Sequence, residues 1–541
     1  MSRMLWQWFD RNILSLGRDM QLSYLPPLLV YLAFGIQGLT GIVGTFYVKE
    51  HLGLSAEFLA ALGFWAGLPF ALKMPLGHLV DLLWRFKSGL IYLGAALLAA
   101  SLLIMAGLIG NPQQMAQFMS VNAWFVLSTL LLPIGFVLQD AVADAMTVEA
   151  VPRHLPDGTL LAENDIKRMH TTMQTLGRVA VIGGSVLVAG VNVWLFADAE
   201  TLADTAKTAL YQQVYLMALV IPLVSVSGVL LNGWLQRRRL AAHRAHGLSD
   251  AEAQSLLNHQ DGDVRANWWI LGGSLVFVTF TLLMGLTELR YGQEAVFAGS
   301  MVIVLFLMGR LLRELDGPAR ATLLGTALVI FMFRATPSAG PGVTWWMIDE
   351  LRFDQSFLSE LSLISSALTL AGMFLFRRFM AERPLYVVVA FLTIAGTILS
   401  LPVLGMSYGL HHWTAVHSGG VVDARFIAVI DTALESPLGQ ISMIPMLAWI
   451  ANSAPNHLKA TFFAVMASFT NLALSAAQLG TKYLNQLFVL SREVKDPATK
   501  AIVTAANYAE LSPLLLTIGL LGILMPGAAL LLAWKLKLKS A

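Results

Sequence analysis

The sequence contains no cysteine and few charged residues. The absence of cysteine excludes disulfides, thiol redox chemistry and thiolate metal sites. Charged residues make up 13% of the 541 residues, whereas hydrophobic residues make up 57%. Soluble domains contain about 25% charged and about 45–50% apolar residues. The composition therefore excludes a soluble globular protein and indicates that lipid surrounds most of the surface.

Several chemical motifs are missing as well. The chain has no nucleophile elbow, no P-loop and no His-Glu-x-x-His zinc motif. His411, His412 and His417 fall in a predicted outer loop, where nothing fixes them as convergent metal ligands. The formal net charge of +2 is too small to indicate nucleic-acid binding. We expect a protein in a lipid bilayer that is not an enzyme and has no metal, cofactor or nucleic-acid partner.

Long apolar stretches predict an all-α integral membrane protein. A spanning helix needs about 20 mostly apolar residues. Glycine and proline are spread through these stretches, which favours helices over a β-barrel. The sequence predicts fourteen transmembrane helices, at 24–48, 58–81, 88–109, 119–147, 170–197, 210–235, 267–289, 295–312, 321–347, 357–376, 384–406, 426–450, 459–488 and 510–535.

The distribution of Lys and Arg orients these spans. Positively charged loops stay in the cytoplasm, and most of the loop Lys and Arg fall there when both termini are placed inside. We therefore predict a multi-pass protein of the inner membrane with both termini cytoplasmic. Residues 1–23 predict an interfacial helix, with a disordered basic leader as the alternative. Lys73, Arg178, Arg334 and Lys482 lie well inside predicted spans, away from their ends.

A repeated segment divides the chain into two halves. The stretch "KEHLGLSAEFL" (Lys49–Leu59) resembles "IDELRFDQSFL" (Ile348–Leu358), and both follow the first span of a half. Two six-helix bundles with an inserted hairpin account for this pattern, and they place a substrate site near the midplane between the bundles. The predicted parts are an interfacial segment (1–23), an N-terminal bundle (24–235), a cytoplasmic loop (236–266), the inserted hairpin (267–318), and the C-terminal bundle with a basic tail (319–541).

Two predicted spans carry paired carboxylates. Asp140 and Asp144 are four residues apart, and so are Asp431 and Glu435, so each pair shares one helix face. An ionised carboxylate at the bilayer centre costs about 2.5–3.5 kcal/mol. Corresponding pairs in both halves predict a shared central cavity in which the acids load and release protons. The alternative is that the acids stay ionised and hold helices together by pairing with a buried arginine.

The first spans of the two halves are interrupted or rich in glycine. Arg334 precedes "ATPSAGPGVTWW", and a helix broken in this way is tolerated only where it lines a cavity or packs in protein. We predict substrate contact there. The corresponding stretch "FGIQGLTGIVG" contains Gln37 among regularly spaced glycines. We favour close helix packing for this glycine strip, with substrate contact as the alternative.

The turn "GHLVDLLWRFK" between spans two and three resembles the signature of the major facilitator superfamily, without its second glycine. Gly77 permits close approach, Asp81 faces a helix N-terminus or an arginine of the other half, and Arg85 supplies a basic residue. The resemblance implies that these residues hold a cytoplasmic gate and do not bind substrate.

Three further blocks resemble the folate-biopterin transporter family. They are "LQDAVADA", "PSAGPGVTWWMIDELRFDQSFLSELSLISSALTLAG" and "KATFFAVMASFTNLALSAAQLG" (Lys459–Gly480). The blocks touch both halves, and they imply a major facilitator-type fold and a transport activity. Muropeptide permeases carry a segment similar to the first block. The sequence departs from the family's pattern in the inserted hairpin and in the loss of the family's basic and aromatic run after Asp81. The identity of the substrate is therefore left open.

The resemblance implies a folate- or pterin-like substrate. Arg178 and Arg334 would bind its carboxylates, and Phe34, Trp65 and Trp345 are candidates for an aromatic wall against its ring. We predict a secondary active transporter that moves an anionic or pterin- or folate-like metabolite by alternating access, coupled to protons by symport, with antiport left open. The alternatives are a muropeptide-type permease and a non-transporting, facilitator-like assembly factor.

Overall fold

The computed structural model describes most of the chain, and most of the described residues are helical. The described residues are 6, 10, 14–52, 54–71, 76, 79–80, 82–83, 86–152, 159–245, 249, 252, 268, 272–273, 276, 279–281, 283–284, 291–313, 315, 317–376, 379, 383–439, 459–495 and 502–536. The predicted gating residues Gly77, Asp81 and Arg85 lie outside them.

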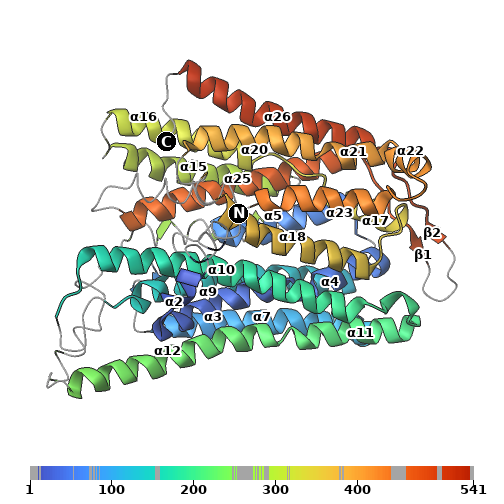
Figure 1. The fold of residues 1–541 in the computed structure, drawn as a ribbon. Coiled ribbons are helices and arrows are strands. Elements are labelled where there is room, and N and C mark those ends of the chain that lie inside the picture. The colour runs from blue at the N-terminus through green and yellow to red at the C-terminus, as the bar shows by residue number, and fades with distance from the viewer. Residues whose placement is uncertain are drawn as a thin grey trace.

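Helices from the first half of the chain pack mainly against one another (Figure 1). They are α2 (Ser15–Arg18), η2 (Leu22–Tyr24), α3 (Leu25–Gly35), η3 (Ile36–Thr40), α4 (Gly41–His51), α5 (Ala56–Ala71), α7 (Lys87–Gly110), α8 (Pro112–Ala116), α9 (Val121–Ala150), α10 (Glu163–Phe196), η5 (Ala199–Thr201), α11 (Asp204–Met217) and α12 (Val220–Ala245). Helix α7 packs on α9 and α11, and α3 packs on α10 and α12.

Helices from the second half form the other side of the molecule. The elements are α15 (Gly292–Arg313), α16 (Gly317–Arg334), α17 (Gly342–Asp349), α18 (Gln355–Leu375), α20 (Leu385–Leu399), α21 (Leu401–Ser407), α22 (Leu410–His417), α23 (Ala424–Glu435), η6 (Ser436–Leu438), α25 (Lys459–Leu487), β1 (Val494–Lys495), β2 (Ile502–Thr504) and α26 (Leu511–Lys535). The two sets of helices meet where α10 packs on α18 and where α5 packs on α25.

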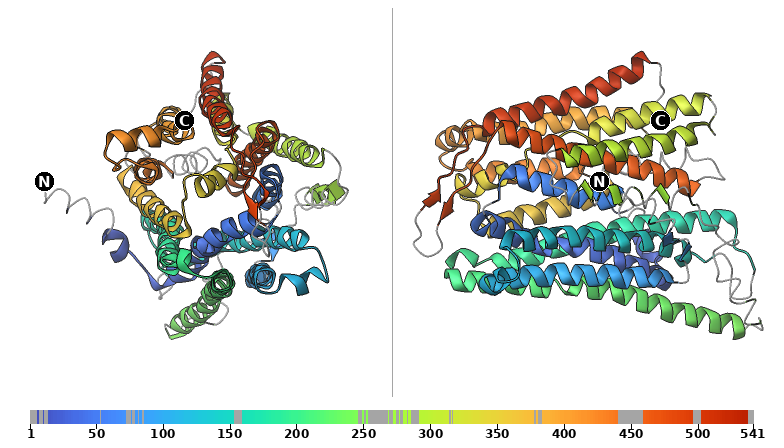
Figure 2. Two further views of the ribbon diagram at one scale, coloured as in Figure 1. Left: turned by 90° about the vertical axis from the view of Figure 1, so that its right-hand side faces the viewer. Right: turned by 180° about the vertical axis from the view of Figure 1, so that it is seen from behind.

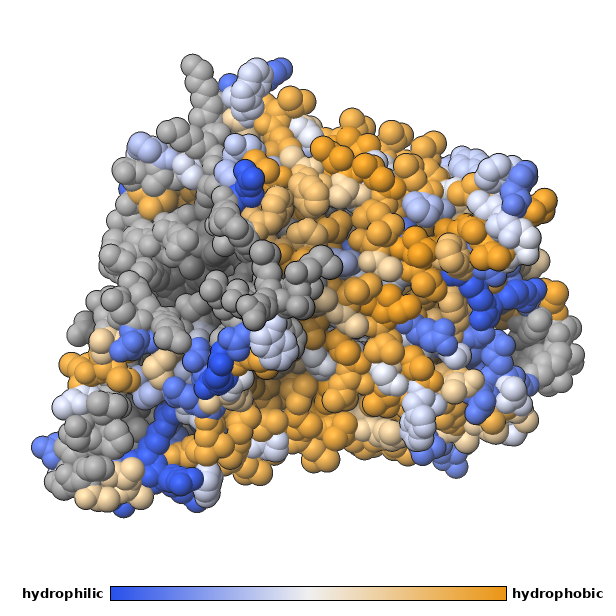
Figure 3. Space-filling model, viewed as in Figure 1, coloured by the Kyte–Doolittle hydropathy of each residue, from blue (hydrophilic) through white to orange (hydrophobic). Residues whose placement is uncertain are grey.

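The helices run side by side, so the molecule has two distinct ends (Figure 2). We call the end that carries the antiparallel strands β1 and β2 the hairpin end. The opposite end, where α12 and α26 finish, is called the linker end. Figure 3 shows a broad hydrophobic belt with hydrophilic side chains at both ends, as expected of a protein that crosses a bilayer.

Eight described segments are long and apolar enough to cross a membrane. They are Leu22–His51, Lys87–Gly110, Val121–Thr147, Thr172–Thr201, Asp204–Ala245, Gln355–Leu375, Leu385–Ser407 and Leu511–Lys535, and the shorter apolar helices Ala56–Phe70 and Gly292–Phe306 accompany them. The chain is therefore a multi-pass helical membrane protein. Most of the seventh predicted span, and the end of the twelfth, fall outside the described residues, so the count of fourteen remains a prediction.

Several boundaries differ from those expected. The ninth predicted span (321–347) consists of α16 and α17, separated at residues 335–341, where the proline and glycine residues predicted an interruption. The sixth predicted span (210–235) contains the break between α11 and α12. Helix α12 then continues to Ala245, into the segment predicted as a loop. The predicted loop with His411, His412 and His417 contains the short helix α22.

The internal repeat is reproduced as a pair of matching helix starts. Ser55 precedes α5, and its Oγ accepts a hydrogen bond from the amide of Phe58 at 3.1 Å. Asp354, at the corresponding place in the repeat, precedes α18 and accepts from the amide of Phe357 at 2.7 Å. Side chains at this position satisfy amides that the first helical turn leaves unpaired. The repeated segment therefore contains the start of α5 and the start of α18 at corresponding positions.

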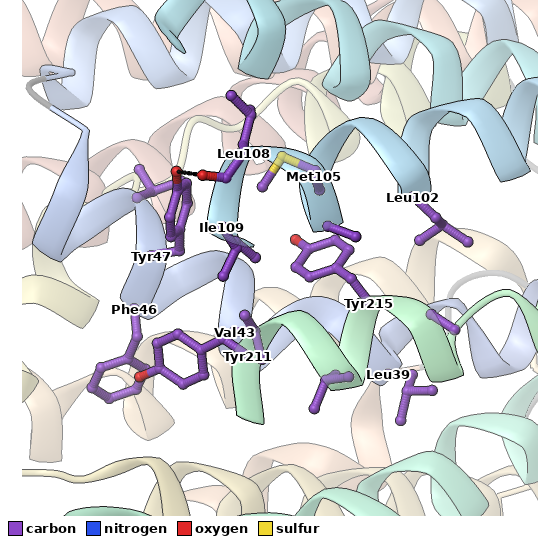
Figure 4. Packing of buried hydrophobic residues seen from close by; sticks show 14 of the residues in the cluster. Leu39, Val43, Phe46, Tyr47, Leu102, Met105, Leu108, Ile109, Tyr211 and Tyr215 are labelled. Atoms are coloured by element: carbon purple, nitrogen blue, oxygen red, sulfur yellow. Dashed lines mark hydrogen bonds between the residues drawn. The ribbon is translucent and has the colours of Figure 1, made fainter. Parts of the chain in front are cut away.

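An apolar core fills the space between α4, α7 and α11 (Figure 4). Val43, Ile109 and Tyr215 are among its buried side chains. The Tyr47 hydroxyl donates a hydrogen bond to the Leu108 carbonyl at 3.2 Å, so its polar tip is satisfied within the core.

Close helix packing is confirmed at Gly35 of the predicted glycine strip. A Cβ atom added to Gly35 would lie 2.2 Å from the Val181 carbonyl oxygen of α10. The same contact involves Gly184, whose added Cβ would lie 2.9 Å from Gly35 Cα. By contrast, an added Cβ on Gly41 meets nothing within 4 Å. The approach of α3 to α10 therefore depends on Gly35 and not on the strip as a whole.

Gly35→Ala is expected to lower the free energy of unfolding by about 1–3 kcal/mol or more, because the methyl group must displace the backbone of α10. Thermal unfolding in detergent measures the effect as a lower Tm. Gly41→Ala is the matched control and should leave the Tm unchanged or slightly raised. Equal losses in the two variants would contradict the packing role of Gly35.

Candidate functional site

A cavity of about 510 Å³ lies between helices of the two halves. Ligand sites usually measure about 300–1,000 Å³. Its lining residues are Ile42 and Thr45 of α4, Thr344 of α17, Leu358, Leu361, Ser362, Ser365 and Thr369 of α18, Thr432 and Glu435 of α23, Ser436 of η6, and Gly439. Because α4 belongs to the first half and the other elements to the second, a relative movement of the halves would reshape this cavity.

The cavity wall is polar but carries little charge. Most of its polar side chains are serine or threonine, and Glu435 is the charged side chain among the described lining residues. Several hydroxyls already donate their proton to a backbone carbonyl: Thr45 to Gly41 at 3.0 Å, Thr369 to Ser436 at 3.0 Å, and Ser436 to Thr432 at 2.5 Å. These hydroxyls keep their acceptor lone pairs for a ligand.

Helix α23 ends at Glu435, and α18 fixes the segment that follows. An added Cβ on Gly372 of α18 would lie 2.2 Å from the Pro437 carbonyl oxygen, so η6 lies directly on the α18 backbone. Asp431, one turn before Glu435, is buried, whereas Glu435 is exposed on the cavity wall. The predicted pair therefore shares a helix, but its two members have different surroundings.

The other predicted carboxylate pair lies at a separate place in the first half. The Tyr31 hydroxyl of α3 donates to Asp144 Oδ1 at 2.7 Å. Asp140 lines the same small gap as Tyr31, and the Tyr31 ring packs against Gly177 of α10, the residue before Arg178. The structure thus brings these predicted residues together around Tyr31, and we call Tyr31, Asp140, Asp144 and Arg178 the Tyr31 cluster.

The cavity described above is called the Glu435 cavity. The Tyr31 cluster lies at a different place from this cavity in this conformation. Asp140, Tyr31 and Phe34 line a gap of about 10 Å³, which is about the room needed by one water molecule. A metabolite of the predicted kind does not fit there. Asp140 and Glu435 therefore line different pockets in this conformation, and the shared central cavity expected from the sequence stays a prediction.

A buried polar network joins the two halves at the hairpin end. The Lys49 ammonium of α4 forms an ion pair with Asp349 of α17. Asp349 also accepts from the Tyr508 hydroxyl at 2.6 Å and from the amide of Glu493 at 3.0 Å. Burial raises the pKa of Tyr508, which keeps its hydroxyl protonated as a donor. Nearby, the Gln355 amide of α18 donates to the Tyr211 hydroxyl of α11 at 2.8 Å.

Arg492 extends this network and involves the predicted substrate residue Trp345. Its guanidinium donates to the Leu54 carbonyl at 2.5 Å and lies 4.9 Å from the centre of the Trp345 ring. Trp345 is buried, and Arg492 stacks on its ring as a cation on an aromatic face. Trp345 therefore contacts a residue of the hairpin-end network, and it is not among the described residues that line the cavity.

The remaining predicted residues are spread over the fold. Gln37 lies half-buried on η3, and Arg334 is the half-buried last residue of α16. Lys482, which the sequence placed inside a predicted span, forms an ion pair with Glu294 of α15 at 2.9 Å. This pair holds α15 against α25.

Sequence reasoning missed Tyr31, the hairpin-end network and the hydroxyl wall. The wall had a signal, because Ser362, Ser365 and Thr369 recur at helical spacing in a predicted span. Lys49 and Asp349 lie at the beginning of the two repeated segments, but nothing local indicates that they pair.

Comparison with known proteins identifies the chain. A family model described as the BT1 family matches residues 264–534, which is half of the sequence. The chain belongs to the BT1 family. A folate-biopterin transporter of Synechocystis sp. is 23% identical over 510 residues, covering 94% of this chain and 83% of that protein. The predicted folate-biopterin transporter family is thereby confirmed, and this BT1 family member is a membrane transporter and not an enzyme.

Solved transporter structures share the fold of this BT1 family member. A POT family transporter in complex with 5-aminolevulinic acid has a TM-score of 0.58 at 14% identity, with 96% of each chain covered. The nucleoside transporter NupG has a TM-score of 0.51 at 12% identity, covering 94% of this chain and 99% of the other. These likenesses show a major facilitator-type helical fold.

Proposed function

We propose that this BT1 family member is a secondary active transporter that moves a pterin- or folate-like metabolite by alternating access, coupled to protons. The observation that carries the proposal is the Glu435 cavity, because its wall combines helices of both halves and its volume suits a small metabolite. The substrate class is supported by the similarity to the folate-biopterin transporter.

The proposal includes the domain arrangement inferred from the sequence. Two six-helix bundles, residues 24–235 and 319–541, rock against each other in the inner membrane, and residues 267–318 form an inserted hairpin. With both termini cytoplasmic, the hairpin end faces the outside. The buried Lys49–Asp349 network supports an outer gate that is closed in this conformation. Gly77, Asp81 and Arg85 form the proposed inner gate.

Proton coupling is assigned to Asp140, Asp144, Asp431 and Glu435. Coupling requires that the substrate affinity differs between the protonated and ionised states of a carboxylate. Support comes from the burial of Asp431 and from the contact of Asp144 with Tyr31.

Arg178, Arg334, Gln37 and Trp345 remain proposed substrate contacts. The two arginines would bind the anionic part of the substrate as its path opens toward them. Trp345 would have to exchange its contact with Arg492 for the substrate, which ties its role to opening of the hairpin end.

Reconstitution tests the proposal. Purified protein in liposomes, with an imposed proton gradient, is expected to accumulate labelled pterin or folate, and collapse of the gradient should abolish the accumulation. Uptake of muropeptides in place of pteridines would replace the proposal with a muropeptide-type permease. If no member of a panel of pterins, folates, muropeptides and dicarboxylates is bound or moved, the assembly-factor hypothesis takes its place.

A further inference from the structure

The hydrogen-bonding character of the Glu435 cavity bears on which part of a substrate it holds. Thr45, Thr369 and Ser436 have already donated their protons to backbone carbonyls, so they present acceptor lone pairs to the cavity. An ionised Glu435 carboxylate is also an acceptor, with two oxygens that can receive two parallel hydrogen bonds. Acceptors therefore face the cavity from two sides, since Thr45 comes from the first half and the others from the second. The remaining wall hydroxyls, of Thr344, Ser362, Ser365 and Thr432, can donate or accept.

The charge of the cavity wall also favours a ligand group that donates hydrogen bonds. Glu435 lines the cavity, and no Lys or Arg is among its described lining residues. A substrate carboxylate placed here would meet a like charge without a compensating cation, which is unfavourable in a partly desolvated site. The wall therefore disfavours the anionic part of a substrate and favours a group with several N–H donors.

The apolar part of the wall suits a flat ring. Ile42 of α4 and Leu358 and Leu361 of α18 are its aliphatic members. Aliphatic side chains contact the faces of a heterocycle, while polar groups at its edge fix the orientation. In a ring whose edge carries an N–H beside an amino group, the edge can donate to the Glu435 carboxylate and the faces can contact the aliphatic side chains.

We propose that the Glu435 cavity is a subsite for the donor edge of an aminopyrimidinone-type ring, in which Glu435 accepts from a ring N–H and the adjacent amino group. The anionic tail of the substrate is bound elsewhere. This assignment rests on the proposed function, because it takes the substrate to be a pteridine. It differs from the expectation that cations dominate the substrate site, since this subsite recognises the ring by acceptors.

Equilibrium binding without a proton gradient tests the subsite separately from coupling. The ligands are pterin, the pteridine-2,4-dione analogue that has an oxygen in place of the amino group, and p-aminobenzoylglutamate as the isolated tail. The full-length protein in nanodiscs is expected to bind pterin at least about 10-fold more tightly than the dione, because the dione presents an acceptor to Glu435. Glu435→Gln should weaken pterin binding about 10–100-fold, reduce the preference over the dione, and leave tail binding unchanged.

Two further variants make the test specific. Glu360→Gln changes an exposed carboxylate on the same lining helix α18 that does not line the cavity, and it should bind all three ligands like the wild type. Thr45→Val removes an acceptor contributed by the first half and should weaken pterin binding several-fold.

Equal binding of pterin and the dione by the wild type would overturn the assignment. Equal loss of pterin and tail binding in Glu435→Gln would overturn it as well. In either case, proton-driven uptake of pterin would leave the proposed function standing. Absence of binding and uptake for every pteridine and folate would remove both proposals.

Discussion

Asp349→Asn is expected to open the hairpin end of the transporter. Asp349 pairs with Lys49 and accepts from Tyr508, and these groups are buried together between the halves. Loss of one partner of a buried ion pair costs about 3–5 kcal/mol. Because this pair joins the two halves, the cost falls on the conformation closed at the hairpin end. The closed population should therefore decrease by more than about 100-fold relative to the open one.

Accessibility labelling measures this shift directly. The chain contains no cysteine, so a single cysteine placed at Thr344 on the cavity wall is a clean reporter. A membrane-impermeant maleimide added from the outside should label this cysteine rapidly in Asp349→Asn and slowly in the otherwise unchanged protein. The labelling rate gives the fraction of open molecules.

Asp354→Asn is the matched control for the first prediction. Asp354 pairs with Arg425 at 2.8 Å, but Arg425 is 47% exposed and both residues belong to the second half. Asp354 is 10% exposed, but solvent reaches Arg425, so loss of this pair should cost less than loss of the buried Lys49–Asp349 pair, and asparagine keeps the helix start of α18. Labelling at Thr344 should therefore stay slow. Similar labelling of the Asp349 and Asp354 variants would exclude the Lys49–Asp349 pair as an outer gate.

Replacement of both acids in the Tyr31 cluster is expected to abolish proton-driven accumulation. An amide cannot carry a proton, so the Asp140→Asn, Asp144→Asn double variant loses the coupling step if these acids perform it. With one proton per substrate, a gradient of two pH units supports about a 100-fold accumulation, since each unit is worth about 1.4 kcal/mol. In the double variant, the internal and external concentrations should become equal. Substrate exchange without a gradient should continue.

Two further variants separate coupling from general damage in the Tyr31 cluster. Tyr31→Phe removes the donor to Asp144 but keeps both carboxylates, so uptake should become several-fold slower and still reach the full accumulation. Glu200→Gln, an exposed acid of the same half, should behave like the wild type. Full accumulation in the double variant would remove Asp140 and Asp144 from coupling and leave the alternative considered from the sequence, in which these acids hold helices together by pairing with a buried arginine.

Interactions between residues close together in the chain could be predicted from the sequence, whereas contacts between residues far apart in the chain could not. Residues four apart on a helix lie on one face, so Asp140 and Asp144 were correctly expected to lie together. The approach of Tyr31 to Asp144 joins α3 to α9, and no local pattern encodes it. Trp345 illustrates the same limit. Its ring was a candidate substrate wall, but its contact is with Arg492, which lies far along the chain.

The sequence by itself indicated that lipid surrounds the protein, where most of its helices lie and which family it resembles. Apolar content and the length of apolar stretches predict membrane helices, because bilayer thickness sets how many residues a span requires. Prolines and glycines marked the break between α16 and α17, and the repeat marked matching helix starts at Ser55 and Asp354. Each of these properties depends on residues close together in the chain.

Only the tertiary structure decided which polar groups meet. It paired Lys49 with Asp349, gathered serine and threonine hydroxyls with Glu435 around a cavity, and kept Asp140 in a separate small pocket. The physical reason is that a buried polar group must find a partner within about 3 Å, and the partner comes from whichever helix packs beside it. Helix packing between distant segments therefore decided which polar groups line the cavity.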